Sequence, residues 1–246
     1  MIHPFRKERI IQRVLAILSF HKIGDPGPGG WNSWFYIPEK TFAGHLRFLK
    51  DNNWNVIDVP AFLAGLRAFE KLPERAVLLT FDDGYRSVRE VALPWLRRFG
   101  YPAVSFVSTG YIGGCSTFDS GVEPEEPICD WEDLRELQQQ GISIQSHGVT
   151  HRGFSSLGPE EQEEELTRSK DVLEAQLRKR VEVFAFPYGD NGGNPPESAK
   201  TLEKVGFRAA CVYGGGPNPL PVADTYRLTR VAMGPDTDLR TELEQK

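Results

Sequence analysis

The chain has 246 residues, of which 39% are hydrophobic and 26% charged, and its formal net charge is −5. This length suits one α/β domain with a substantial core, and the slightly acidic balance leaves no basic stripe for a nucleic-acid partner. We expect a single domain over residues 1–246, with its core between residues 14 and 232. The sequence does not indicate an oligomeric state.

Residues 1–13 contain several basic side chains. The apolar stretch over residues 10–20 is interrupted by Gln12 and Arg13. No small-residue cleavage pattern precedes that stretch, so we expect neither a signal peptide nor a transmembrane segment. The default location is therefore cytoplasmic, and export stays open as the alternative.

Short apolar runs alternate with helical segments along the chain. Strands are predicted over 14–20, 55–59, 76–81, 103–108, 142–146, 181–186 and 208–213. Helices are predicted over 38–52, 60–69, 87–99, 131–140, 159–179 and 195–205. Seven strands separated by helices favour a parallel, TIM-like α/β barrel, whose active site forms at the C-terminal ends of the strands.

The predicted strand 76–81 ends in two adjacent carboxylates, Asp82 and Asp83, which Gly84 follows at once. Adjacent carboxylates repel each other and are costly to desolvate, so a buried pair needs a cation or several hydrogen-bond donors. A solvated Asp-Gly turn is the alternative.

Two histidines follow the predicted strand 142–146 in the same way. The residues between His147 and His151 are poor helix formers, which indicates a loop presenting both rings. Two imidazoles and a carboxylate are a common ligand set for a catalytic divalent metal. A surface or hydrogen-bonded histidine pair is the alternative, but the neighbouring Asp82 and Asp83 favour the metal.

A third polar turn follows the predicted strand 181–186. Pro187 has no amide hydrogen and ends the strand, so the backbone amides of Tyr188 and Gly189 can turn toward a fixed point above the sheet. Amides aimed in this way can hold an oxyanion. Taken alone, Pro-Tyr-Gly is an ordinary turn.

In this order, residues 80–84, 147–151 and 186–189 resemble the first three motifs of the NodB-homology polysaccharide deacetylases. The similarity runs from about Leu15 to about Ala232. It implies an irregular (β/α)7 barrel and a metal-dependent hydrolase acting on carbon-nitrogen bonds other than peptide bonds. The implied substrate is an acetylated sugar, from which metal-activated water removes the acetyl group.

The resemblance also implies roles for individual residues. Asp83, His147 and His151 would bind the metal, Asp82 would be the general base, and the backbone amide of Tyr188 would help to hold the oxyanion. Zinc is the first choice for these donors, although cobalt, nickel or iron would fit them too.

The chain departs from the commonest family pattern at two places. Ala185 stands where an arginine usually orients the base, and no histidine follows His151 to serve as the acid. The biofilm poly-N-acetylglucosamine deacetylases share such an apolar residue and share a histidine after the first strand, so we favour that branch. His21 is then a catalytic candidate, with a structural histidine as the alternative. Arg230 is a weaker candidate for the positive partner of Asp82, and a surface arginine is the favoured interpretation.

The loop over residues 24–36 is rich in glycine and proline and carries Trp31, Trp34, Phe35 and Tyr36. These rings suit a glycan groove, but we expect at least two of them to pack the loop onto the barrel instead.

A second loop, over residues 110–130, is an insertion that caps the site or is merely surface. A disulfide between its Cys115 and Cys129 is possible if the chain is exported, although three cysteines do not define a disulfide framework.

The predicted helix from Pro159 has acidic residues in its first turns, as the helix dipole favours. We interpret them as a solvated face rather than as ligands. They are Glu160, Glu161, Glu163, Glu164 and Glu165.

The favoured function is removal of acetyl groups from a GlcNAc-containing polysaccharide or oligosaccharide. One alternative is a hydrolase of a small linear amide or a formylated lipid-linked sugar on the same barrel. Another is a catalytically impaired sugar-binding protein, against which the intact Asp82, Asp83, His147 and His151 argue.

Overall fold

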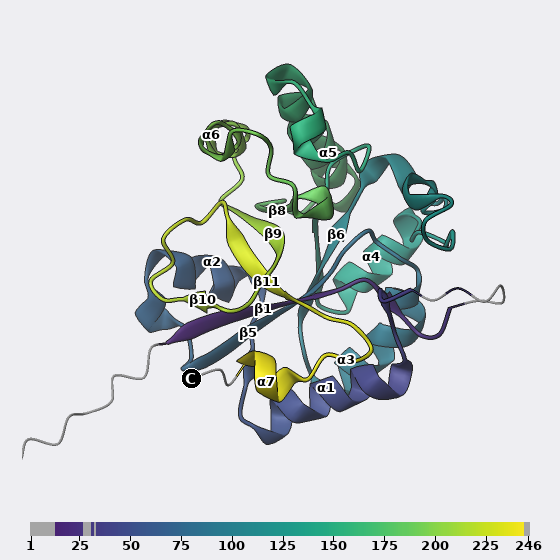
Figure 1. Cartoon of the computed structure of the whole chain (residues 1–246), viewed down its shortest axis with the longest axis vertical. Helices are drawn as coiled ribbons and strands as arrows, with labels where there is room; N and C mark the ends of the chain where they lie inside the picture. The colour runs from purple at the N-terminus through teal and green to yellow at the C-terminus, as the bar shows by residue number, and fades with distance from the viewer. Residues whose placement is uncertain (1–12, 27–30, 32, 244–246) are drawn as a thin grey trace, which may run out of the picture.

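Seven parallel strands close into a barrel in the computed structural model, which describes residues 13–26, 31 and 33–243 (Figure 1). Around the ring the order is β1, β5, β6, β7, β8, β9 and β11, and β11 pairs again with β1. The strands are β1 (Val14–Phe20), β5 (Arg75–Phe81), β6 (Ala103–Val107), β7 (Ile142–Ser146), β8 (Val183–Ala185), β9 (Ala209–Gly215) and β11 (Leu228–Ala232). The expected irregular (β/α)7 barrel is confirmed.

Helices pack around the outside of this ring (Figure 1). They are α1 (Glu39–Asp51), α2 (Val59–Arg67), α3 (Leu93–Phe99), α4 (Trp131–Gln139), α5 (Pro159–Leu177), α6 (Pro195–Val205) and α7 (Leu239–Leu243). The exception is α2, whose buried side chains join those that fill the barrel. A π-helical turn, Val88–Ala92, leads directly into α3 and accounts for the start of the helix predicted over 87–99. All six predicted helices are present, and the short α7 was not predicted.

The membership of the ring differs from the predicted set of strands at one position. The segment expected as a strand over 55–59 forms only β4 (Asn55–Val56), which pairs with the beginning of β5. It ends early because the Asp58 side chain accepts a hydrogen bond from the amide of Ala61 and so begins α2. The seventh strand of the ring is instead β11, which lies between β9 and β1 and whose apolar run is interrupted by Arg230.

Three further short strands lie outside the ring. β2 (Lys22–Ile23) and β3 (Tyr36–Ile37) pair in parallel beyond the end of β1. β10 (Asn218–Pro219) pairs antiparallel with the start of β1. The β2–β3 pair holds the two ends of the aromatic loop together beside the barrel mouth.

The core has two layers because alternate side chains of a strand point to opposite faces. Leu15 and Ile17 of β1 belong to the cluster that also contains side chains from α2, whereas Leu18 and Phe20 pack with side chains from α1 and α3 to α6. The cluster that contains Leu18 and Phe20 therefore lies between the strands and the outer helices. The cluster that contains Leu15 and Ile17 fills the barrel. This filled interior fixes the strand ends on which the polar side chains sit.

The three cysteines are free, and the possible Cys115–Cys129 disulfide is not formed. Cys115 is exposed, whereas Cys129 is buried with its thiol 3.6 Å from the carbonyl oxygen of Tyr85. None of the described helices has the length and apolar character needed to cross a bilayer. Most of the segment on which the signal-peptide expectation rests, residues 1–12, lies outside the described residues.

Candidate active site

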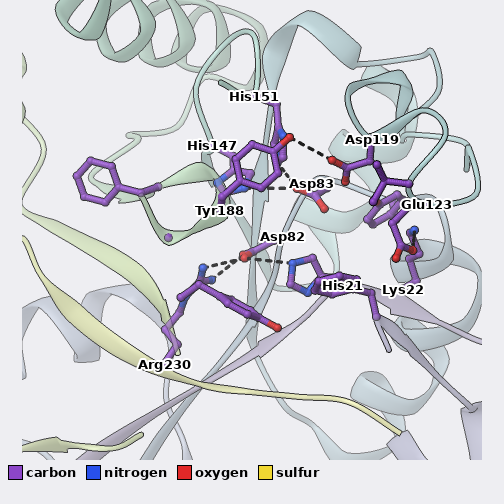
Figure 2. Close-up of a pocket in the computed structure, with 16 residues that line it drawn as sticks. His21, Lys22, Asp82, Asp83, Asp119, Glu123, His147, His151, Tyr188 and Arg230 are labelled. Atoms are coloured by element: carbon purple, nitrogen blue, oxygen red, sulfur yellow. Dashed lines mark hydrogen bonds and ion pairs between the residues drawn. The ribbon is translucent and has the colours of Figure 1, made fainter. Parts of the chain in front are cut away.

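Residues from the C-terminal ends of the barrel strands surround one cavity of about 300 Å³ (Figure 2). The strand exits contribute His21 after β1, Asp82 and Asp83 after β5, His147 and His151 after β7, and Tyr188 after β8. The structure therefore brings together the six residues to which the sequence analysis gave catalytic or metal-binding roles. β9 and β11 add Tyr213 and Arg230.

Arg230 is fully buried and holds Asp82, so its favoured interpretation as a surface arginine is wrong. Its Nη1 and Nη2 donate to Asp82 Oδ1 and Oδ2 at 2.6 and 2.7 Å, and its Nε donates to the carbonyl oxygen of Val212. Such a two-pronged contact fixes the carboxylate plane. Ala185 stands where an arginine would usually orient the base. Arg230, from β11, supplies the positive partner of Asp82 instead.

The hydroxyl of Ser19 also donates to Asp82, at 3.2 Å. Burial by itself would raise the pKa of the Asp82 carboxyl, but the charges around it, Arg230 first, hold its pKa below the ordinary value. Asp82 is therefore an ionised, oriented carboxylate that faces the cavity.

Asp83 turns away from this pair toward the two histidines. Its Oδ1 lies 3.3 Å from Nε2 of His147 and 3.0 Å from Nε2 of His151, and all three side chains are buried. One donor atom from each residue lies within 4.8 Å of the other two. Burial opposes ionisation of Asp83, but the imidazoles, with His151 the strongest, keep its pKa well below the ordinary value.

The donor set fits a divalent cation. Although the two imidazole nitrogens are near Asp83 Oδ1, neither reaches it with hydrogen-bond geometry, and this buried oxygen has no hydrogen-bond partner. His147 Nδ1 lies 2.7 Å from the carbonyl oxygen of Ala185, which is the contact that leaves Nε2 free to bind a metal. One cation among the three donors would satisfy the unpaired oxygen and both rings.

The loop that carries the two histidines is held by a residue that the sequence analysis misplaced. Glu165 of α5 is buried and not part of a solvated acidic face. Its Oε2 accepts hydrogen bonds from the amides of Val149 and Thr150 at 2.6 and 3.0 Å, and its Oε1 accepts one from the Thr150 hydroxyl at 2.7 Å. The expected loop between His147 and His151 is present, and this carboxylate determines its shape.

Backbone strain gathers at the same place. Five described residues other than glycine have positive φ, and three of them are Asp83 (70°), His151 (57°) and Tyr188 (58°). Such conformations cost about 1–3 kcal/mol each and persist where the surroundings enforce them, often at functional sites. Gly84, with φ of 80°, continues the turn, and a Cβ there would meet Val107 Cγ1 at 2.7 Å.

His21 lies on the side of Asp82 opposite Arg230 (Figure 2). Its Nε2 is 3.8 Å from Asp82 Oδ2, and its ring packs at 4.8 Å from that of Phe35. Burial lowers the pKa of His21 more than Asp83 and Asp82 raise it, so the neutral imidazole predominates near pH 7. Its Nδ1 is buried without a hydrogen-bond partner.

The turn after β8 leaves one backbone amide free. Gly189 and Asp190 donate their amides to the carbonyl oxygens of Phe186 and Pro187, whereas the amide of Tyr188 makes no hydrogen bond to any of the described residues. The Tyr188 side chain extends over the histidines, and its hydroxyl donates to Asp119 Oδ1 at 3.1 Å (Figure 2). This turn therefore offers both an unpaired donor and a cover for the site.

The insertion over residues 110–130 caps the cavity, as one of the two expectations had it. Asp119, Val122 and Glu123 line the cavity wall. Lys22 Nζ lies 3.1 Å from Glu123 Oε2, and the Lys22 side chain is almost fully buried. This ion pair joins the insertion to the strand beyond β1.

The four aromatic residues of the loop 24–36 behave differently from one another. Phe35 lines the cavity, and Tyr36 is buried with its hydroxyl donating to Glu126 at 2.6 Å. Trp31 and Trp34 are about 40% exposed, and the indole of Trp34 donates to Asp236 at 2.7 Å. We expected at least two of the four rings to pack the loop onto the barrel, but of the four only Tyr36 is buried.

Some cavity residues carried no signal in the sequence. Tyr213 of β9 places its hydroxyl out of solvent without a hydrogen-bond partner. Asp119 and Glu123 stand in the insertion and Lys22 in the short strand β2, and the path of both segments depends on tertiary contacts. Lys22 comes directly after His21, and this position is the one signal that pointed to any of them.

Known proteins that are similar to this chain point to one family. The family model described as polysaccharide deacetylase matches residues 69–210, which is more than half of the chain. YxkH of Bacillus subtilis (strain 168), whose name marks it as a candidate polysaccharide deacetylase, is 28% identical over 221 residues, covering 90% of this chain and 72% of that protein.

A second relative is the poly-beta-1,6-N-acetyl-D-glucosamine N-deacetylase of Escherichia coli (strain K12). It is 28% identical over 218 residues, which cover 75% of this chain but only 32% of that protein. The chain thus spans about a third of the length of this relative.

Among solved structures, the deacetylase PplD of Streptococcus pyogenes superposes with a TM-score of 0.82 at 23% identity, covering 95% of this chain and all of that one. IcaB from Ammonifex degensii gives a TM-score of 0.76 at 24% identity, with 91% and 93% of the two chains covered. These likenesses establish the fold. The matched family model shows that the chain belongs to the polysaccharide deacetylase family.

Proposed function

We propose that this protein is a metal-dependent hydrolase that removes acetyl groups from N-acetylated sugars of a GlcNAc-containing polysaccharide or oligosaccharide. The observation that carries the proposal is the placement of Asp82 beside the cluster of Asp83, His147 and His151. An oriented carboxylate next to a three-ligand metal site is what amide hydrolysis by activated water requires.

Asp83, His147 and His151 would hold the cation, and zinc suits two imidazoles and one carboxylate. When bound, such a cation lowers the pKa of water and polarises the acyl carbonyl. Asp82 is the base that accepts a proton from the attacking water, and Arg230 keeps it ionised and oriented. The free amide of Tyr188 is the donor for the oxyanion.

The departing amine needs a proton. His21 is our candidate for delivering it, because it lines the cavity and its Nε2 is 3.8 Å from Asp82, which has just accepted one. Since the lowered pKa keeps His21 neutral at rest, it has to gain its proton within the reaction cycle. In that cycle Asp82 passes its proton to His21 and recovers its charge, and His21 passes the proton on to the amine.

The sugar class rests on two supports. Relatives such as the Escherichia coli protein are named as N-deacetylases of poly-beta-1,6-N-acetyl-D-glucosamine. Phe35, Tyr188 and Tyr213 line the cavity and offer faces on which a sugar ring can pack.

The test is acetate release from N-acetylglucosamine oligomers before chelation, after chelation and after zinc is restored. We expect Asp82→Asn to retain zinc and lose most activity, and His147→Ala to lose both. Asp51→Asn, at an exposed site at the end of α1, is the matched control and should behave as wild type. Acetate release that survives chelation would refute the metal dependence, and equal zinc content in the Asp82 and His147 variants would refute the assigned roles.

A further inference from the structure

The two metal-site histidines are held by different kinds of contact. His147 donates from Nδ1 to a backbone carbonyl, as most metal-binding histidines do. His151 has no such partner, because its Nδ1 is buried without any hydrogen bond. Something other than a hydrogen bond therefore fixes the plane of the His151 ring.

Aromatic rings surround His151 on two sides. The ring of Phe118 stacks on its face with centroids 4.0 Å apart and an interplanar angle of 30°. The ring of Tyr188 approaches nearly edge-on, at 4.7 Å and 72°. These contacts restrict both the tilt and the rotation of the imidazole.

The two rings are themselves tied together. The hydroxyl of Tyr188 donates to Asp119, which is the next residue after Phe118 (Figure 2). Phe118, His151, Tyr188 and Asp119 thus form a closed circuit of contacts, which we call the aromatic collar. On its outer side, Tyr111 packs edge-on against Phe118 at 4.9 Å.

We propose that Phe118 is a positioning residue for the metal site, and that its ring fixes the direction of the His151 imidazole as the Ala185 carbonyl fixes that of His147. The backbone at His151 is in a strained left-handed conformation, so the side chain depends on its neighbours for a fixed direction. The inference gives the insertion a defined task. It rests on the metal site of the proposed function.

The experiment compares zinc affinity by chelator competition for wild type, Phe118→Leu and Phe118→Tyr, at a temperature at which all are folded. Leucine keeps the apolar bulk but removes the flat face, so we expect affinity to fall about tenfold or more, as for the loss of other groups that orient metal ligands. Tyrosine keeps the face and should bind zinc as wild type does. The visible spectrum of the cobalt-substituted protein should shift for the leucine variant alone.

The control removes a stacked ring elsewhere. Tyr101 stacks on Phe99 at 5.5 Å and 26°, away from the cavity. Tyr101→Leu should lower the Tm of the metal-free protein without weakening zinc binding. The inference is overturned if Phe118→Leu binds zinc as tightly as wild type with an unchanged cobalt spectrum, or if Tyr101→Leu weakens zinc equally. A wild type that binds no zinc defeats the proposed function itself.

Discussion

Replacing Arg230 by methionine should destabilise the protein severely, because it leaves the Asp82 carboxylate buried without its cation. Two charge-assisted hydrogen bonds at 2.6 and 2.7 Å are lost, and the Ser19 hydroxyl at 3.2 Å is what remains of the hydrogen bonds to this carboxylate. Hydrogen bonds to charged groups contribute about 1.5–3 kcal/mol each. Breaking a buried pair costs about 3–5 kcal/mol, so we expect a loss of that size in the free energy of unfolding near pH 7.

The loss should depend on pH. In the wild type the folded-state pKa of Asp82 lies below its ordinary value, so its ionised form contributes stability above about pH 4 and loses that contribution as the pH falls through the folded pKa. Without Arg230 the folded-state pKa rises, and keeping the carboxylate ionised becomes costly. The difference between variant and wild type should therefore be largest near pH 7 and shrink toward pH 4.

Urea unfolding near pH 7 and near pH 4 measures both quantities. Arg208→Met is the matched control, since Arg208 pairs with Glu182 at 2.8 Å but is about one-third exposed. It should cost about 1 kcal/mol or less. An Arg230→Met loss no larger than this control, or one that is the same at both pH values, would refute the reasoning. If Arg230→Met retains measurable activity, the acid limb of its kcat/KM profile against pH should lie at higher pH than in the wild type.

Three further changes test the site. Glu165→Gln should lower the free energy of unfolding by about 1–3 kcal/mol and weaken zinc binding, because a neutral amide replaces the carboxylate in its charge-assisted hydrogen bonds to the histidine loop, and wild-type affinity would contradict this. Gly84→Ala should cost about 1–3 kcal/mol in urea unfolding, since the new Cβ meets Val107 at a positive φ, and an unchanged midpoint would contradict the strain. Tyr213→Phe should leave the Tm unchanged or raised, because its hydroxyl has no partner in the free protein, and should raise KM about 2- to 10-fold; a fall in Tm would mean a structural role instead.

The clustering of Asp83, His147 and His151 was predictable because local signals and topology agree there. The strands before Asp83 and His147 are short apolar runs with clear ends, and parallel strands of a barrel carry their C-terminal ends to one face. Spacing alone left His147 and His151 ambiguous. The neighbouring Asp82 and Asp83 favoured a metal-binding pair, and the resemblance to a known family then implied a role for each residue.

Other parts of the site depend on contacts that no local pattern encodes. Arg230 looked like a surface residue because it interrupts an apolar run, whereas its burial depends on Asp82, which is 148 residues away in the chain. Glu165 looked solvated because four other glutamates share the start of its helix, and only the position of the histidine loop distinguishes it. A buried charge is recognised by its partner, and the partner is known only once the fold is.

The two adjacent aspartates show how the fold makes a costly sequence useful. Asp83 adopts φ of 70°, so the chain turns between the two side chains and their carboxylates point to different partners (Figure 2). Asp82 faces Arg230, on β11, and Asp83 faces the imidazoles that follow β7. Because each carboxylate has its own source of positive charge or hydrogen bonds, both stay ionised although they are neighbours in the sequence. One can then act as a base while the other serves as a ligand, and the strained turn at Asp83 is what keeps the two roles apart.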